Sequence, residues 1–279
     1  MPIRLNHREL STGRCRPSLL ASTVLMSAVC SWVPAGEEST PARPTAQQSA
    51  PADHPLTPAI RVAQDCLELL QDVRDYECVL TKRERINGQL TTQTMFVRFR
   101  EQPFSIYCKF GEPFAGREVL YVAGQNSGQM LAHEGSGWKA AFGTISLPLD
   151  GADAKAENRH PLTDAGLRNL INLLIKQWNY ESQYGEINVQ YYPDAKLGKV
   201  PCRVVEVTHP QPRRQFSYHM TRLYVDGATG LPVRVENYGW PQQQSGQPVL
   251  IEEYTYSRLQ TNVGLTDQHF DRSFKDYKF

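Results

Sequence analysis

The sequence predicts an α+β protein, mainly antiparallel β, in which a strongly curved sheet packs on two helices. Three observations lead to this fold class. Apolar residues recur at helical spacing in two segments, 57–73 and 163–178. Most of the remaining chain alternates apolar and polar residues with a period of two, which is typical of strands with one buried face. Turn residues separate these runs at hairpin spacing, so the strands are expected to pair antiparallel.

The N-terminal part of the chain is expected to lie outside this fold. Residues 1–35 combine four arginines, an uncharged apolar run and, at Ala35, a small residue at which a signal peptidase would cut. The run is shorter than the ~20 residues needed to cross a bilayer, so cleavage near Ala35 is favoured over an uncleaved membrane anchor. Residues 36–58 are rich in Pro, Ala, Ser and Gln and are interpreted as a disordered linker. The sequence therefore predicts an exported protein of the periplasm or cell envelope, with a single domain at residues 59–279.

The charge balance argues against a nucleic-acid partner. The chain has 30 basic and 29 acidic residues, and residues 1–35 hold four of the basic and one of the acidic ones. The exported part therefore carries a formal charge of about −2, without the excess of positive charge that nucleic-acid binding requires.

The elements of the domain follow from local patterns. The first helix is expected to have Thr57 as its N-cap and Pro58 at its first helical position. Asn87-Gly88 predicts a hairpin turn between the first two strands. Residues 135–162 are expected to form a long irregular connection, and the second helix follows with Thr163 as its N-cap. The predicted strands are 76–86, 90–100, 104–110, 117–122, 129–133, 186–192, 201–208, 216–225, 232–238 and 249–261.

The glycine-rich stretch Asp226–Gly230 invites two interpretations, a phosphate-binding loop or a hairpin turn. A phosphate loop needs a helix after its glycines, because the helix N-terminus supplies the N–H groups and the dipole. Here the following residues, 232–238, alternate as a strand. The stretch is therefore predicted to be a hairpin turn.

Several short motifs resemble known families. Asp226, the Thr-Gly-Leu-Pro turn at 229–232 and Glu252-Glu253-Tyr254 resemble the periplasmic lipoprotein-carrier superfamily and its sigma-factor-regulator relatives. A closer resemblance, over most of residues 60–279, is to an uncharacterised domain family found mainly in planctomycete bacteria. It rests on the segments 75–78, 82–85, 100–104, 116–119 and 262–267. That family has no established activity, whereas the wider superfamily implies a half-barrel of antiparallel strands wrapped over helices, with a concave apolar face that accepts acyl chains.

This resemblance and the strand pattern together suggest candidate ligand-binding residues. A lipid-like ligand on the concave face would be held by burial of apolar area, at about 25 cal/mol per Å². Arg83, Arg85 and Arg117 are candidates for an anion-binding rim, because the guanidinium fork suits phosphate. Alternatively, the charged run 82–85 forms a cross-strand ladder with charged residues of neighbouring strands. The candidates on the apolar face are Phe104, Ile106, Phe110, Tyr224, Val233 and Ile251; the candidate ladder partners are Arg98, Arg100, Arg117 and Glu118.

The predicted function is non-enzymatic binding of a lipid-like or acylated ligand, a lipid or a lipoprotein. The alternative is a structural or regulatory module with a filled core that binds an envelope protein. An apolar cavity of several hundred Å³ between sheet and helices would favour the first, and a filled layer the second. The sequence contains no G-x-S-x-G, no H-E-x-x-H and no Cys/His spacing typical of zinc, so no catalytic residue, metal ligand or cofactor is predicted.

The cysteines and the C-terminal tail leave alternatives open. The exported part contains four cysteines, Cys66, Cys78, Cys108 and Cys202. Export permits disulfides, and buried free thiols are an equal alternative. If a disulfide forms, Cys78 and Cys202 are the expected partners because both lie in predicted strands. The aromatic tail 262–279 is expected to pack against the domain, with a partner contact as the alternative.

Overall fold

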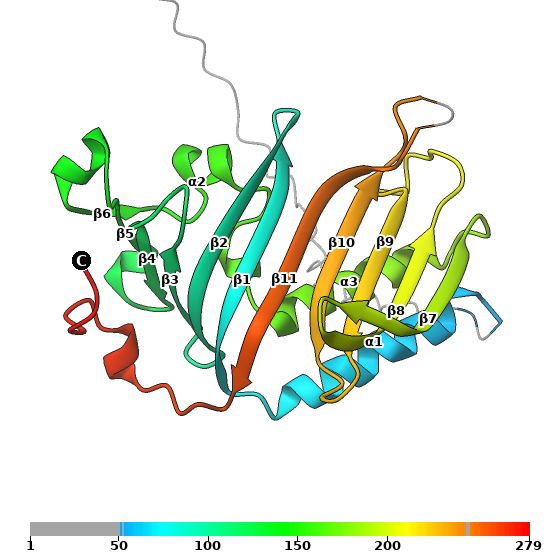
Figure 1. The fold of residues 1–279 in the computed structure, drawn as a ribbon, viewed down its shortest axis with the longest axis horizontal. Helices are drawn as coiled ribbons and strands as arrows, with labels where there is room; N and C mark the ends of the chain where they lie inside the picture. Colours follow the sequence, from blue (N-terminus) through cyan, green and yellow to red (C-terminus); the bar gives the residue numbers. More distant parts are fainter. Residues whose placement is uncertain (1–50, 52, 244–245) are drawn as a thin grey trace, which may run out of the picture. The chain divides into compact units, whose positions relative to one another are not determined.

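Eleven strands form one antiparallel sheet in the part of the chain that the structure describes. The structure is a computed structural model and describes residue 51, residues 53–243 and residues 246–279. The expected signal peptide and most of the expected linker lie outside these residues. The strand order is β6-β5-β4-β3-β2-β1-β11-β10-β9-β8-β7 (Figure 1), and every neighbouring pair is antiparallel. The predicted fold class is confirmed.

The strands are β1 (Asp75–Ile86), β2 (Gln89–Arg100), β3 (Ser105–Phe110), β4 (Glu118–Val122), β5 (Met130–His133), β6 (Thr144–Leu147), β7 (Asn188–Leu197), β8 (Val200–Thr208), β9 (Met220–Asp226), β10 (Pro232–Gly239) and β11 (Val249–Thr261). The helices are α1 (Leu56–Gln71), α2 (Ala152–Glu157) and α3 (Leu167–Glu181). Among the described residues, none of the helices has the length and apolar character needed to span a membrane.

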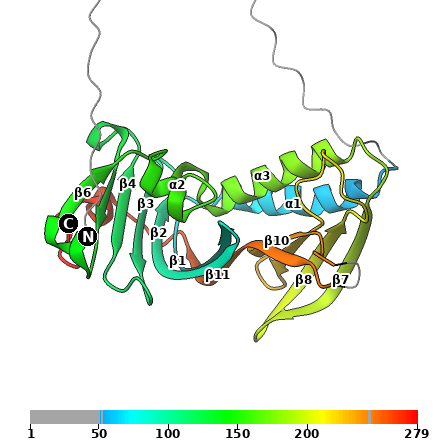
Figure 2. The ribbon, with the colours of Figure 1, turned by 90° about the horizontal axis from the view of Figure 1, so that it is seen from above.

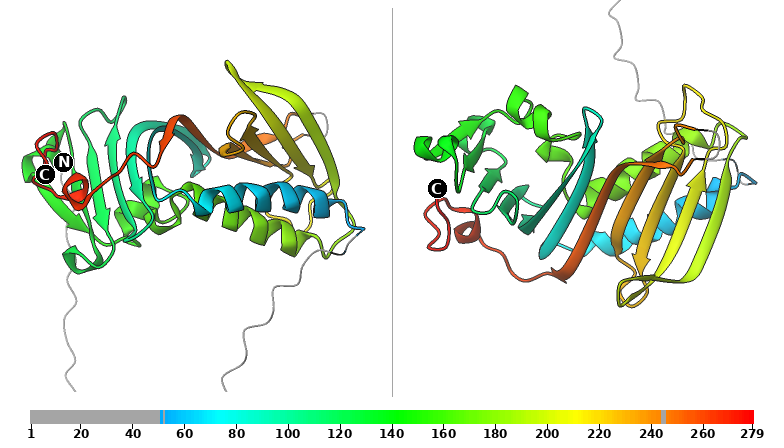
Figure 3. Two further views of the ribbon diagram at one scale, coloured as in Figure 1. Left: turned by 90° about the horizontal axis from the view of Figure 1, so that it is seen from below. Right: turned by 45° about the horizontal axis from the view of Figure 1, so that its top comes forward.

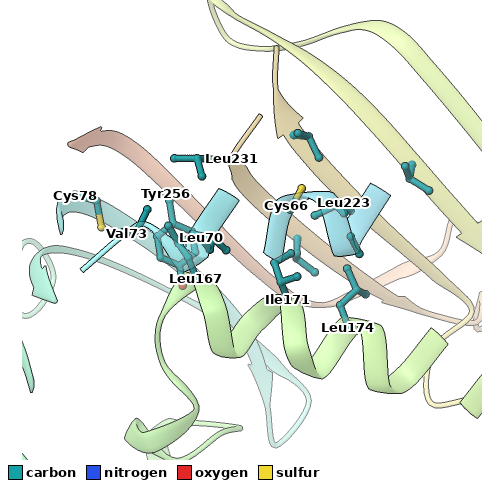
Figure 4. Packing of buried hydrophobic residues seen from close by; sticks show 14 of the residues in the cluster. Cys66, Leu70, Val73, Cys78, Leu167, Ile171, Leu174, Leu223, Leu231 and Tyr256 are labelled. Atoms are coloured by element: carbon teal, nitrogen blue, oxygen red, sulfur yellow. The ribbon is translucent and has the colours of Figure 1, made fainter. Parts of the chain in front are cut away.

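The helices α1 and α3 lie side by side on one face of the sheet, which curves over them (Figures 2 and 3). This helix-covered side is called the inner face, and the opposite side the outer face. The apolar stripes of both helices meet inner-face residues of the strands, among them Leu223 and Tyr256 (Figure 4). Trp178 of α3 and Leu223 of β9 are both 0% exposed. The layer between helices and sheet is therefore the main hydrophobic core.

The two hairpin turns that the sequence predicts are present. Asn87 and Gly88 both have positive φ, 50° and 82°, as a two-residue turn between β1 and β2 requires. Asp226 accepts hydrogen bonds from the backbone N–H groups of Ala228 and Thr229, both at 2.8 Å, and Gly230 takes a positive φ of 72°. The glycine-rich stretch is therefore the turn between β9 and β10.

The helix starts differ from the sequence prediction. α1 begins at Leu56, so Thr57 lies inside the helix and its hydroxyl donates to the carbonyl of Pro51 at 2.6 Å. The N–H of Leu56 is instead accepted by Nδ1 of His54 at 3.1 Å. The N-cap of α3 is Gly166 rather than Thr163, and its φ of 106° is open only to glycine.

The 135–162 connection is also more ordered than expected. It contains the edge strand β6 and the short helix α2, which lies near the β2–β4 end of the inner face (Figure 2). Short alternating runs such as Thr144–Leu147 give a weak periodic signal, and the scattered Gly and Pro residues obscure it further. Pairing of β6 with β5 fixes this strand, which the local pattern alone does not predict.

The C-terminal tail packs on the outer face, as the sequence predicts. Phe270 is 3% exposed and belongs to a second hydrophobic cluster with β3 and β4 residues. Tyr277 stacks on Tyr107 of β3, with ring centroids 3.8 Å apart. Arg98 of β2 donates to the Tyr277 hydroxyl at 3.0 Å and lies over the Phe274 ring. The outer face of β3, expected to face solvent, is therefore covered, and Tyr107 is only 2% exposed.

Candidate functional site

A row of polar side chains crosses four strands on the otherwise apolar inner face. Glu84 of β1 pairs with Glu252 of β11, Glu252 with Asn237 of β10, and Asn237 with Thr221 of β9. All four are buried, and both glutamates are 2% exposed. Thr221 donates to the Asn237 carbonyl, and the Asn237 amide donates to Glu252, both at 2.8 Å. We call these four residues the inner polar row.

Two carboxylates directly opposite each other repel unless donors are supplied. The segment after α2 supplies three of them, and strand residues and Tyr218 supply the others. Arg159 and His160 each donate to Oε2 of Glu252 at 2.9 Å, and the Tyr218 hydroxyl donates to Oε1 at 2.7 Å. Glu84 is bonded by the Arg159 backbone N–H at 3.2 Å and lies 3.2 Å from the ammonium group of Lys82. The Tyr254 hydroxyl donates to Oε1 of Glu84 at 2.5 Å. The row thus binds residues 159–160 to the centre of the sheet.

The pKa values within this cluster follow from its contacts. The hydrogen bond to Glu252 is the main reason that the pKa of His160 is raised above its usual 6.5, with burial acting in the opposite direction. Burial disfavours the charged form of Glu252, but hydrogen bonds from His160, Tyr218 and Asn237 outweigh it and lower the pKa to about 2. A carboxylate with so low a pKa is a weak base at neutral pH, so the cluster is suited to anchoring rather than to proton transfer.

The His160–Glu252 pair predicts a pH-dependent contribution to stability. A raised pKa in the folded state means that His160 stabilises the fold below about pH 6.5 and that this contribution disappears as the pH rises through the raised value. The lowered pKa means that Glu252 contributes above about pH 4.5 and loses its contribution as the pH falls toward 2. We therefore expect His160→Ala to reduce the free energy of unfolding more at about pH 5.5 than at about pH 9. Urea unfolding of both proteins at the two pH values measures the difference, and equal losses at both would contradict it.

A second titratable pair is enclosed near the end of α3. Nε2 of His209 lies 3.6 Å from Oε2 of Glu181, and both side chains are 1% exposed. Burial raises the pKa of Glu181 to about 8 and lowers the pKa of His209 to about 4. The two groups are therefore uncharged near neutral pH. Nδ1 of His209 donates to the Tyr218 carbonyl at 3.1 Å, which leaves Nε2 as an acceptor facing the protonated carboxyl group. Both groups are enclosed, so a substrate has no access to this pair.

The six apolar candidates do not form one surface. Phe104, Ile106 and Phe110 belong to the inner core around β3. Tyr224 lies on the outer face: Arg234 lies over its ring, at 5.6 Å, and its hydroxyl donates to Glu236, so its expected place on the concave face is wrong. The remaining two, Val233 of β10 and Ile251 of β11, each occupy the extra position of a β-bulge and lie outside both hydrophobic clusters. Bulges break the alternation from which their faces were predicted.

The three rim candidates already have partners within the chain. Arg83 forms an ion pair with Glu253 of β11 at 3.0 Å. Arg85 donates to the carbonyl groups of Leu250 and Gly88, at 3.0 and 2.8 Å. Arg117 binds Glu134 and Glu157 at 2.9 and 2.6 Å, and its guanidinium group lies over the Phe114 ring. In the charged run, Arg83 thus forms a cross-strand ion pair with β11, whereas Lys82 pairs with Glu84 of the same strand, and in the described part of the chain none of the expected partners forms an ion pair with the run.

All four described cysteines are buried free thiols. The expected Cys78–Cys202 disulfide is wrong, because β1 and β8 are separated in the sheet by β11, β10 and β9. At ~4.8 Å per strand the two residues are roughly 19 Å apart, whereas a disulfide needs Cα atoms within about 7 Å. Burial raises the pKa of Cys66 and of Cys108 to about 12 each, so these thiols stay protonated and behave as small apolar side chains.

Two open depressions on the described surface lie away from the layer between sheet and helices. One, of about 460 Å³, is a groove between α1 and α3 on the solvent side of the helices. It is called the helix groove. The other, of about 530 Å³, lies over β7, β8 and β9 and includes Tyr192, Val204 and Tyr224. Tyr192, Val204 and Tyr224 form one cross-strand row. Because Tyr224 lies on the outer face, this second depression is on the outer face as well.

Comparison with known proteins decides the family. Residues 73–279 match the family described as "Protein of unknown function (DUF1571)". The chain belongs to the DUF1571 family. This agrees with the resemblance to an uncharacterised domain family that the sequence motifs indicate. No curated protein matches the sequence of this DUF1571 protein.

Several solved structures resemble this DUF1571 protein at low similarity. A LolA superfamily protein from Nitrosomonas europaea has 13% identity and a TM-score of 0.35, covering 77% of this chain and 97% of that one. The Mycobacterium tuberculosis lipoprotein LppX has 11% identity and a TM-score of 0.41, with coverage of 77% and 99%. An uncharacterised conserved protein from Thermus thermophilus has 9% identity and a TM-score of 0.42, with coverage of 79% and 97%.

Sequence reasoning missed the residues that organise the inner polar row of this DUF1571 protein. Arg159 and His160 lie in a segment predicted to be irregular, and their partner Glu252 is 93 and 92 residues away from them in the chain. One signal was available. Glu84 lies an even number of residues from the buried Cys78 in β1, and Glu252 an even number from the buried Tyr256 in β11. Each glutamate therefore points to the same face as its apolar neighbour and places a charge there. Buried charges require partners, which marks this part of the inner face as special without identifying the donors.

Proposed function

We propose that this DUF1571 protein is a non-enzymatic interaction module of the cell envelope that binds a partner protein on its helical layer. The observation that carries the proposal is the filled layer between helices and sheet. Trp178, Ile171 and Leu223 are each 0% exposed there. An acyl chain could enter this layer only by displacing such side chains. Losing the packing of one large buried side chain costs about 3–5 kcal/mol of unfolding free energy. A surface-bound partner requires no such displacement.

The helix groove supports this proposal as the docking surface. Leu67, Leu173 and Ile175 contribute apolar lining, and Gln64 and Asn172 contribute amide groups that can donate and accept hydrogen bonds. Leu173 is 44% exposed although it is a large apolar residue in the middle of a helix. A groove of this kind between two helices suits an apolar segment of another protein, most simply the apolar face of a third helix.

Two further observations support a binding role in the envelope. Glu181 and His209, whose pKa values are both shifted by burial, are enclosed, and Glu252 is a weak base, so neither site offers an accessible acid or base. Residues 1–35 have the charge and apolar pattern of a signal peptide. Export would place the helix groove among proteins of the periplasm or envelope.

Site-specific photocrosslinking in cells that express the protein tests the docking surface. Benzoylphenylalanine in place of Leu173 is expected to give a discrete adduct with one envelope protein, because the residue lies in the helix groove. The matched control is the same substitution at Tyr180, which is 48% exposed on the same helix but outside the groove lining. Leu173→Glu should abolish the complex while Tyr180→Glu leaves it intact. Identical adducts from both positions, or none from Leu173, would argue against the helix groove.

Native mass spectrometry of protein purified from its own envelope tests the function that the sequence pattern first suggests. Binding of a lipid-like or acylated ligand stays a prediction from that pattern and the superfamily resemblance. We expect the mass of the chain without bound lipid, because the layer is filled. A stoichiometric lipid adduct would overturn the proposed function and favour the carrier-like one.

A further inference from the structure

The depression on the outer face, here called the slot, is lined by Tyr192 and Tyr224, its two aromatic walls, from the strands on either side of β8. Tyr192 of β7, Val204 of β8 and Tyr224 of β9 are cross-strand neighbours in a single row. Since neighbouring strands are ~4.8 Å apart, the Cα atoms of the two tyrosines lie roughly 10 Å apart, with the small Val204 side chain between them. The slot measures about 530 Å³, which lies within the usual range of small-ligand sites.

Both aromatic walls are held in place by hydrogen bonds. The Tyr192 hydroxyl donates to Gln190 at 2.6 Å, although the residue is 41% exposed. The Tyr224 hydroxyl donates to Glu236 at 3.3 Å, and the Arg234 guanidinium group lies over its ring at 5.6 Å. Tyrosines that are fixed before a ligand arrives lose little conformational entropy on binding.

The next cross-strand row contributes Arg222 to the lining of the slot. In this row Glu206 of β8 pairs with Arg222 of β9, and Arg222 with Glu236 of β10. Arg222 is 2.5 Å from Glu206 and 3.7 Å from Glu236, so its charge is compensated. At the rim, Asp194 and Lys196 contribute one charge of each sign. The slot therefore offers both donors and acceptors without a net charge that would select an anion or a cation.

We infer that this slot binds a neutral glycan through a pyranose ring placed between Tyr192 and Tyr224. A pyranose ring has apolar C–H faces and a hydroxyl-bearing edge. Its faces match the two tyrosine walls, and the hydroxyl groups of its edge can donate to Asp194 and accept from Lys196 and Arg222, which line the slot. An aromatic peptide side chain would fit the walls but would make no hydrogen bonds to Asp194, Lys196 or Arg222. The neutral polyhydroxylated ring is therefore the ligand that uses both parts of the slot.

Isothermal titration of the full chain with two probes tests this inference: the β-1,4-linked hexamer of N-acetylglucosamine and cellohexaose. At least one is expected to bind, and Tyr192→Ala is expected to weaken its binding at least tenfold because one wall is lost. Tyr192→Phe keeps the wall and should weaken binding far less. Tyr180→Ala, which removes an equally exposed tyrosine outside the slot, should leave the affinity unchanged.

Three results would overturn the glycan site: no heat of binding with either sugar at about 10 mM, an unchanged affinity in Tyr192→Ala, or preferential binding of the peptide acetyl-Phe-Gly-Phe-amide. Circular dichroism of each variant establishes that the fold is retained. The proposed partner docking is tested separately, because Leu173→Glu lies in the helix groove on the other side of the sheet and should leave sugar binding intact.

Discussion

Replacing Glu252 by alanine is expected to lower the free energy of unfolding by about 3–5 kcal/mol, the usual cost of removing one partner from a buried ionic cluster. Glu252 is 2% exposed and accepts four hydrogen bonds, from Arg159, His160, Tyr218 and Asn237. Its removal leaves the buried Asn237 amide and the Tyr218 hydroxyl without an acceptor. It also removes the side-chain contacts of Arg159 and His160 with Glu252, leaving Arg159 held by Glu84 and Arg85, so urea unfolding should show a lower midpoint.

Two variants separate the loss of the cluster from the loss of a charge. Glu252→Gln keeps the size of the side chain and one carbonyl acceptor, so we expect a loss intermediate between the native chain and Glu252→Ala. Glu186→Ala removes a carboxylate that also forms a two-pronged ion pair, with Arg213 at 2.8 Å, but both side chains are about half exposed. Exposed pairs contribute little, so this variant should unfold almost as the native chain does. A Glu252→Ala protein as stable as Glu186→Ala would mean that the inner polar row does not anchor the 159–160 segment.

Most of the fold could be predicted because it is encoded locally. The period-two runs that define β1, β2 and β11 each extend over 12 or 13 residues, long enough to identify them as strands despite local irregularities. Asn87-Gly88 fixes one hairpin by its backbone conformation alone. Short elements with weak patterns, β6 and α2, were missed because their stability comes from pairing and packing partners elsewhere in the chain.

The candidate sites could be predicted only in part, because they depend on which distant residues meet. The parity rule places Ile106 correctly in the core, but it fails at Val233 and Ile251, where a bulge shifts the alternation. Likewise the rule identifies Tyr192 and Tyr224 as strand residues, yet the slot between them exists only because β8 places the small Val204 there. Local patterns assign each strand its faces, whereas the sheet order determines which faces share a site.

Replacing Phe270 by alanine is expected to cost about 3–5 kcal/mol of unfolding free energy, the range found for fully buried phenylalanines. The residue lies beyond β11, which ends at Thr261, in a tail that could equally have served as a loose arm for a partner. Its ring is nevertheless 3% exposed, packs with Leu120 and Val122 of β4, and lies under the guanidinium group of Arg100 at 4.8 Å. The tail is therefore expected to unfold together with the sheet in one transition.

The matched control for this prediction is Val263→Ala, in the same tail but 40% exposed, which should have little effect on stability. Urea unfolding monitored by tyrosine fluorescence and by circular dichroism should then give coincident transitions in both proteins, with a lower midpoint only in Phe270→Ala. If Phe270→Ala were as stable as Val263→Ala, the tail would not contribute to the fold, and its aromatic residues would be free to contact a partner. The coincidence of the two transitions is informative in itself, because the tail covers Tyr107 of β3 and can detach independently only by exposing that buried ring to water.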